Sequence, residues 1–200
     1  MSKVPVYFDS RTSHLCFKVA EFSHAMADAT SEESSRKHYC IVGIVFCAFA
    51  VEAMLNHYGD ILVRDWKNTE RKLGGKRERH KTVFDKANMP GFLGTSVYQK
   101  IKECFLLRDN LAHGRSYDEI KDVEIDQPGE KGSVWQVLSA GSSLEAEATF
   151  DRLDCYIRVA NEIQAQIESN GVYPSWSSKS GQNFCEWPLS LQGARLWPSK

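Results

Sequence analysis

The stretch that most constrains the fold is residues 31–58, the most apolar part of this 200-residue chain. From Cys40 to Val51 it is hydrophobic on nearly all sides of a helix, and Gly59 is a natural stop. A surface helix has a single apolar stripe, so a helix that is apolar all round must be covered by neighbouring elements. The sequence therefore predicts a central helix over 31–58, buried in a bundle or at a dimer interface.

Three more segments have the apolar periodicity of helices that could cover the central one. They span residues 10–29, 61–73 and 144–169. The predicted core stripe of the first segment is Leu15, Val19, Phe22 and Met26, and that of the last is Leu153, Ile157, Ala160, Ile163 and Ile167. Thr30 and Glu33 have capping-box spacing ahead of the central helix. These patterns predict an all-α fold.

Residues 121–139 interrupt the helical pattern. Val123 and Ile125 alternate with acidic residues. Pro and Gly then mark a turn at 128–132, and the alternation resumes at Trp135. Alternation on both sides of a turn is typical of a β-hairpin. We expect a small hairpin inserted into the helical domain.

The last thirty residues differ in composition from the rest. We place a helical domain at 1–170 and a tail at 171–200, which is rich in Ser, Pro and Gly. The tail also carries the aromatic residues Trp176, Phe184, Trp187 and Trp197. A disordered tail would be poor in aromatic residues, so we expect part of it to pack on the domain or on a partner. Stacking of nucleic-acid bases on these rings is the alternative.

The formal net charge of -1 does not indicate a nucleic-acid partner for the whole chain. Residues 64–86, however, contain nine basic and four acidic residues, a local net charge of +5. Basic side chains supply the sequence-independent part of nucleic-acid affinity. This basic stretch is a candidate RNA-binding surface, and the alternative is a solvated charged face around a loop.

The sequence predicts a cytoplasmic protein with no membrane partner. Its N-terminus lacks the apolar core of a signal peptide, and the apolar run is shorter than the roughly 20 residues that span a bilayer. The six cysteines are scattered without a Cys-x-x-Cys pair, which indicates buried free thiols in a reducing compartment. We expect no metal and no other cofactor.

A helix that begins near Ser96 carries the residues with the clearest chemical meaning. Ser96 and Gln99 have capping-box spacing, and Gly114 is a natural helix stop. Arg108 projects into the middle of the apolar stripe of this helix. A guanidinium cannot lose its charge, so its burial requires a structural carboxylate or an anionic ligand such as phosphate.

Residues 108–113 form the pattern Arg-x-x-x-x-His. It reads Arg108-Asp109-Asn110-Leu111-Ala112-His113, followed by Gly114. This pattern resembles the signature of the HEPN superfamily, and the end of the central helix, with Glu52 and Asn56 on one face, resembles the second helix of those domains. The resemblance implies an up-and-down helical bundle, a homodimer, and metal-independent ribonuclease activity of the prokaryotic defence or toxin–antitoxin type. It also implies an antitoxin or another defence-system protein as a partner.

The resemblance implies catalytic roles for Arg108, His113 and Asp109. RNA is cleaved without metal when its own 2′-hydroxyl attacks the phosphorus, and histidine is suited to the proton transfers. Arginine is suited to the phosphate because its charge is permanent and its donors match two oxygens. Asp109 lies four residues from His113 and can hold the imidazole in one tautomer. The residues expected to bind substrate or support the site are Asn110, Arg115, Glu52 and Asn56.

Three further expectations concern the surroundings of this motif. Glu52 is expected to pair with Arg108 across the bundle, the alternative being that it only solvates the end of its helix. Toxins of the family that pair with nucleotidyltransferase antitoxins usually have a tyrosine two residues after the histidine. This chain departs from that subgroup, because it has Arg115 at that position. In an ideal helix Arg108 and His113 point about 140° apart. Both reach one phosphate only if the last turn unwinds or if a second chain contributes one of them in a dimer cleft.

Two other interpretations remain open. The chain could be a non-catalytic HEPN-like module that binds RNA or a protein, in which case His113 is dispensable and the basic stretch is not. Arg108 and His113 could also belong to a buried ion-pair network without catalysis. A metal-dependent enzyme is not indicated, because the sequence has no paired carboxylate–histidine ligand set.

Overall fold

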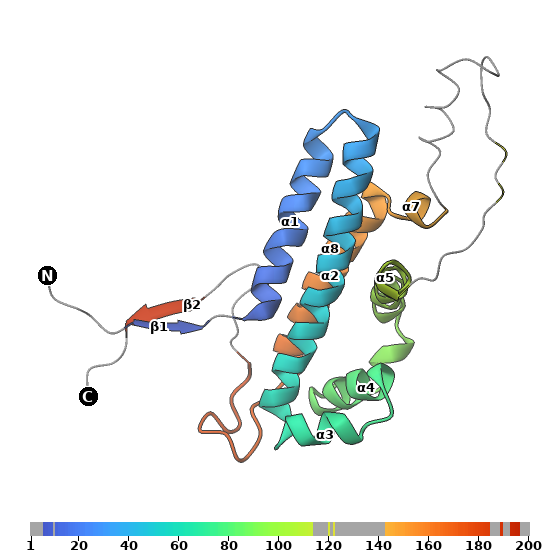
Figure 1. The fold of residues 1–200 in the computed structure, drawn as a ribbon. Helices are drawn as coiled ribbons and strands as arrows, with labels where there is room; N and C mark the ends of the chain where they lie inside the picture. The colour runs from blue at the N-terminus through green and yellow to red at the C-terminus, as the bar shows by residue number, and fades with distance from the viewer. Residues whose placement is uncertain are drawn as a thin grey trace, which may run out of the picture.

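The computed structural model describes residues 6–9, 11–113, 120, 122, 143–184, 189 and 193–196, which form a mainly helical fold (Figure 1). Its helices are α1 (Thr12–Ala29), α2 (Glu33–Leu62), α3 (Trp66–Lys72), α4 (Lys76–Lys86), the 3-10 turn η1 (Phe92–Gly94), α5 (Ser96–His113), α7 (Ser143–Glu147) and α8 (Phe150–Asn170). The expected all-α class is confirmed for this part of the chain, apart from one short antiparallel pair that no pattern indicated. This pair joins β1 (Val6–Asp9) to β2 (Gly193–Leu196). Apart from Asp122, the expected hairpin at 121–139 lies outside the described residues.

The helix α2 is the centre of the bundle, as its all-round apolarity predicts. α1 packs along it, and α5 and α8 also pack against it (Figure 1). Its buried apolar residues lie on several sides of the helix and include Cys40, Ile44, Cys47, Ala48, Val51, Leu55 and Tyr58. Gly43 allows α8 to approach closely, because a Cβ at this position would overlap the Leu153 side chain.

The expected stop at Gly59 is wrong, since α2 continues to Leu62. The glycine is needed there for packing, because a Cβ at Gly59 would overlap the indole of Trp66. The helix expected over 61–73 is consequently reduced to α3, and its first residues belong to α2.

Among the described residues, α2 is the one helix long and apolar enough to cross a membrane by length and composition. Its mean hydropathy reaches 1.9 over an 18-residue window, so the shorter run from Cys40 to Val51 understated its apolar length. Half of that window is buried inside the protein. Its packing against α1, α5 and α8 gives this apolar surface a role in the core.

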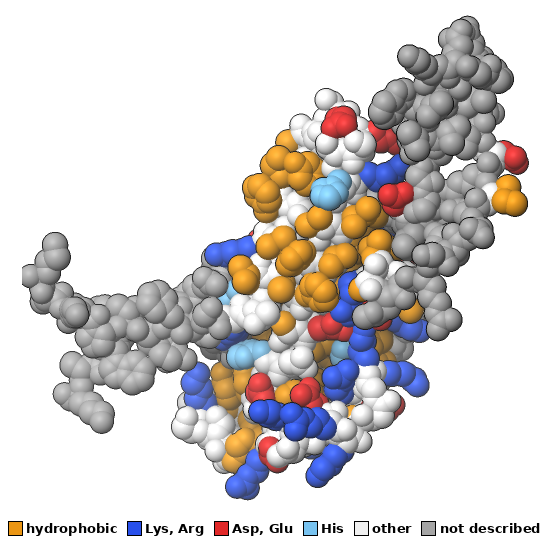
Figure 2. Space-filling view, viewed as in Figure 1, with side chains coloured by type: hydrophobic (Ala, Val, Ile, Leu, Met, Phe, Trp, Pro, Cys, Tyr) orange, Lys and Arg blue, Asp and Glu red, His pale blue; other side chains and the backbone are white. Residues whose placement is uncertain are grey.

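The predicted core stripe of α1 is wrong. Leu15 and Phe22 are 59% and 64% exposed, and Val19 and Met26 are only half-buried. The opposite face is buried instead, and it includes the residues Ser13, His14, Cys16, Phe17, Ala20, Ser23 and Ala27. Most of these side chains are small, so this face fits closely against α2, and the larger apolar residues are left on the outside. Figure 2 shows that hydrophobic side chains gather over the upper part of the visible face, where α1 and α2 lie.

The two expected capping boxes are also wrong, although the helices begin close to the expected positions. Thr95 caps α5, because its Oγ1 accepts a hydrogen bond from the backbone N–H of Tyr98 at 3.2 Å. The Gln99 side chain donates instead to the carbonyl of Leu93, at 2.7 Å. At the start of α2, the carboxylate of Glu32 accepts the hydroxyls of the two serines that follow Glu33.

The C-terminal part of the bundle follows the sequence more closely. The segment expected at 144–169 is divided between α7 and α8, and Thr149 caps α8 by accepting from the backbone N–H of Arg152 at 3.3 Å. The predicted stripe is buried except for the half-buried Ile157. The expectation that part of the tail packs on the domain is confirmed, since Phe184 is buried and stacks on Tyr58 with ring centroids 5.6 Å apart.

The basic stretch 64–86 is mostly helical, because α3 and α4 occupy most of it. The helix α4 was not expected, since charged residues fill most of its first two turns. It is held in place by Val83, Phe84 and His80, all of which are buried. Lys and Arg side chains gather in the lower part of Figure 2, where α3 and α4 lie.

Candidate functional site

Four charged side chains from three helices form one cluster around Arg108. Arg108 on α5 places its Nη2 2.7 Å from Oε1 of Glu52 on α2. Lys76, the first residue of α4, places its Nζ 2.9 Å from the same carboxylate oxygen. The expected pairing of Glu52 with Arg108 across the bundle is confirmed.

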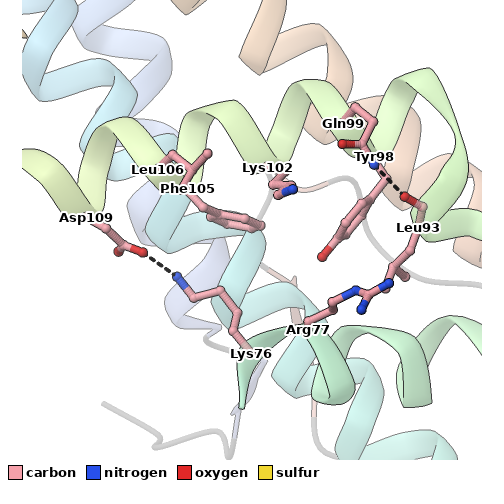
Figure 3. A pocket seen from close by; sticks show the side chains of 9 residues that line it. All are labelled: Lys76, Arg77, Leu93, Tyr98, Gln99, Lys102, Phe105, Leu106 and Asp109. Atoms are coloured by element: carbon pink, nitrogen blue, oxygen red, sulfur yellow. Dashed lines mark hydrogen bonds and ion pairs between the residues drawn. The ribbon is translucent and has the colours of Figure 1, made fainter. Parts of the chain in front are cut away.

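Asp109 closes the cluster from the other side. Its Oδ1 lies 2.9 Å from Nε of Arg108, and its Oδ2 accepts a hydrogen bond from Lys76 at 3.1 Å (Figure 3). The four residues therefore alternate in charge around a closed ring, which we call the Arg108 cluster: Arg108, Glu52, Lys76 and Asp109. Two cations and two carboxylates give the cluster no net charge.

Arg108 is nearly enclosed. Only 8% of the residue is exposed, and its guanidinium lies 5.0 Å from the ring centroid of Phe49. Burial raises the pKa of Glu52, but hydrogen bonds from Lys76 and Arg108 outweigh this effect and leave the pKa below its usual value. The Glu52 carboxylate is therefore ionised at neutral pH, as a buried guanidinium requires.

The guanidinium retains donors that the cluster does not use. Its Nε faces Oδ1 of Asp109 at 2.9 Å as an ion pair, without the geometry of a hydrogen bond to any described residue. An arginine has five N–H donors, and Glu52 takes up only one side of the fork. The cluster thus holds the arginine in place without saturating it.

The other predicted site residues are not part of this cluster. Asn110 is exposed on α5, and Asn56 lines a different hollow together with Arg11, His57 and Asp60. His113 is the last residue of α5, but its side chain lies outside the described part of the structure, as does all of Arg115. The expected contact between Asp109 and His113 therefore stays a prediction, and Asp109 is engaged by Arg108 and Lys76.

A cavity of about 480 Å³ opens beside the cluster, between the start of α4 and the outer face of α5 (Figure 3). We call it the α4–α5 cavity. Its basic lining residues are Lys76, Arg77 and Lys102. Its remaining walls come from Leu93, Tyr98, Gln99, Phe105, Leu106 and Asp109.

A buried histidine lies behind this cavity. The Nδ1 of His80 is 3.0 Å from the hydroxyl of Tyr98, and both residues are buried. Burial lowers the pKa of His80 to about 4, so its imidazole is neutral at pH 7. Burial likewise raises the pKa of Tyr98. This neutral pair supports the cavity wall without adding charge to it.

Sequence reasoning missed both Lys76 and the cavity. Lys76 lies 24 residues from Glu52 and 33 from Asp109 along the chain, so no local spacing relates it to either carboxylate. The available signal was the cluster of positive charges in residues 64–86, which gives a region but no partner.

Among the residues that the structure describes, no group of three or more His, Cys, Asp or Glu side chains could hold a metal ion. Four of the five described cysteines, Cys16, Cys40, Cys47 and Cys104, are buried and all five are free thiols.

Comparisons with known proteins provide no relative for this chain: no protein-family model, no curated protein and no solved structure matches it.

Proposed function

We propose that the chain is a metal-independent endoribonuclease of the HEPN type, working as a homodimer in prokaryotic defence or in a toxin–antitoxin pair. The observation that carries the proposal is the position of Arg108. It is buried near the end of α5, five residues before the His113 that ends the helix, and it is held by Glu52 and Asp109. A rigidly held guanidinium in this position is suited to a phosphate in a pentacoordinate transition state.

The proposed reaction uses the RNA's own nucleophile. A base removes the proton of the 2′-hydroxyl, and the 2′-oxygen forms a bond to phosphorus while the bond from phosphorus to the 5′-oxygen breaks. The departing 5′-oxygen takes up a proton, and the other fragment keeps a 2′,3′-cyclic phosphate. In the proposal His113 performs the proton transfers, Arg108 stabilises the negative charge on the phosphate, and Asp109 with Glu52 orients Arg108.

Exposed apolar side chains on α1 and α2 support the proposed dimer. Leu15 and Phe22 of α1 are largely exposed, and so in part is Phe49 of α2. Exposed apolar patches of this kind mark interaction surfaces. Because Phe49 contacts Arg108, a second chain packed over Phe49 would lie beside the Arg108 cluster.

A cleavage assay with purified protein tests the proposal. Wild type, His113→Ala and the control His38→Ala are incubated with mixed tRNA and single-stranded RNA in the presence of chelator. His38 is exposed on α2, so its loss should leave activity intact. We expect cleavage by wild type and the control, with 2′,3′-cyclic phosphate ends, and none by His113→Ala. Equal cleavage by all three proteins would contradict a role for His113.

A second candidate function is a non-catalytic HEPN-like module that binds RNA or a protein. The observation in its favour is that two carboxylates already balance Arg108 and Lys76, so the cluster needs no ligand to be stable. This candidate predicts that none of the three proteins cleaves RNA and that His113→Ala binds it as wild type does.

A further inference from the structure

We infer that the α4–α5 cavity is a nucleotide-binding subsite, which takes one phosphate and one base of a single-stranded RNA beside the Arg108 cluster. The inference rests on the proposed function and extends it by naming where the strand continues beyond the reacting phosphate.

The first step is the charge of the cavity. Lys76, Arg77 and Lys102 line it, and Asp109 is its one acidic residue. Lys76 is committed to Asp109, whereas Arg77 and Lys102 form no ion pair with any residue that the structure describes. Figure 3 shows Arg77 and Lys102 on opposite walls, one from α4 and one from α5. Two uncommitted cations at one hollow fit the charge of a phosphate.

The carboxylates next to Arg77 and Lys102 in the sequence, Glu78 and Glu103, do not line the cavity. Glu103, the residue after Lys102, lies 3.1 Å from Lys100. Glu70 at the end of α3 faces Arg79 at 4.0 Å. Within the described residues the cavity therefore keeps a positive balance.

The second step is the apolar part of the cavity. Leu93 and Leu106 line it together with the rings of Tyr98 and Phe105, and Leu106 is 54% exposed. A phosphate alone needs no such wall, whereas an unpaired base presents a flat apolar face to aromatic and aliphatic side chains. The volume of about 480 Å³ lies within the range of small-ligand sites, roughly 300–1,000 Å³.

The third step is continuity with the proposed reaction site. Lys76 and Asp109 belong both to the Arg108 cluster and to the cavity lining. A strand whose reacting phosphate lies at Arg108 therefore has its neighbouring nucleotide at the mouth of the cavity. The basic residues of α4 are then part of the substrate path rather than a solvated face.

Binding of an uncleavable strand tests the subsite independently of catalysis. The probe is a short fluorescent RNA made only of 2′-O-methyl nucleotides, which lacks the attacking hydroxyl, and its binding is followed by fluorescence anisotropy over a range of salt concentrations. The test variant is Arg77→Ala with Lys102→Ala. The matched control is Lys67→Ala with Lys72→Ala, which removes the same charge from exposed positions on α3.

We expect the salt slope of the test variant to fall by about 0.7, since one neutralised phosphate of a single strand contributes about 0.7. If both proteins bind equally at about 1 M salt, this slope corresponds to a roughly 5-fold weaker affinity at about 0.1 M salt. The control should lose much less. Leu106→Ser should weaken binding without changing the salt slope, because it removes only apolar contact.

Equal losses in the two double variants would overturn the inference, because they would indicate a diffuse basic surface. Displacement of the probe by inorganic phosphate as readily as by a free mononucleotide would overturn the base-binding part. Displacement by the mononucleotide but not by phosphate would support a nucleotide site. If the mononucleotide displaces the probe less effectively than a longer strand does, the strand is the ligand. Cavity-dependent binding without cleavage would refute only the proposed nuclease, and cleavage without cavity-dependent binding would refute only the subsite.

Discussion

Acidification should destabilise this protein through the buried histidine behind the α4–α5 cavity. His80 is buried on α4, in contact with Tyr98 and Phe105. Loss of hydration on burial is the main reason that its pKa falls to about 4. The negative charge of Glu52 raises the pKa of His80, whereas the positive charges of Lys76 and Arg79 lower it further.

The sign and size of the effect follow from the difference between the folded and unfolded chains. The unfolded histidine has the ordinary pKa of 6.5, so between pH 6.5 and about 4 the unfolded chain binds a proton that the folded chain does not. The contribution of neutral His80 to the free energy of unfolding is therefore fully present above pH 6.5 and is lost as the pH falls towards 4. The gap corresponds to about 3 kcal/mol, of which about 2 kcal/mol is lost between pH 7 and pH 5.

Urea unfolding followed by circular dichroism at pH 7, 6 and 5 measures this loss. The pKa of Glu52 is lowered, so its stabilising ionisation persists through this range and Glu52 does not contribute to the loss. We expect the pH dependence to be strongly reduced in His80→Gln and unchanged in the control His38→Gln, which replaces an exposed histidine. The same loss between pH 7 and pH 5 in His80→Gln as in wild type would refute the reasoning.

Three further predictions concern packing, association and charge. Gly59→Ala should lower the free energy of unfolding by about 1–3 kcal/mol, because the new Cβ overlaps the Trp66 indole. The control Gly94→Ala places its Cβ in open space and should be nearly neutral, and urea unfolding compares the two variants. Phe22→Asp should weaken the proposed homodimer while leaving the fold intact, since this side chain is 64% exposed; sedimentation velocity detects the change, and a monomeric wild type would contradict it. Arg108→Leu should lower the free energy of unfolding, measured by thermal or urea unfolding, by about 2 kcal/mol. This is less than the loss from breaking a fully buried ion pair, because Glu52 and Asp109, which lose their partner, are partly exposed. An unchanged free energy of unfolding would show that the ion pairs contribute nothing.

The sequence alone predicted several elements of the fold and one contact of the site. The central position of α2 followed from its apolarity on all sides, and the positions of α5 and α8 followed from helical periodicity and from the residues that end them. The pairing of Glu52 with Arg108 could be predicted because a buried guanidinium requires a carboxylate and Glu52 directly follows the apolar run of the central helix. These are consequences of local hydrogen bonding, of periodicity and of the cost of burying charge.

Only the tertiary structure decided the rest. It selected the small-residue face of α1 for burial, extended α2 through Gly59, and brought Lys76 to the Arg108 cluster. Each of these results depends on how closely two helices approach, which no spacing within one segment encodes. The α4–α5 cavity has the same origin, because Arg77 and Lys102 lie 25 residues apart and meet only when α4 folds against α5. The sequence determined where the helices lie along the chain, and packing determined which of their faces meet.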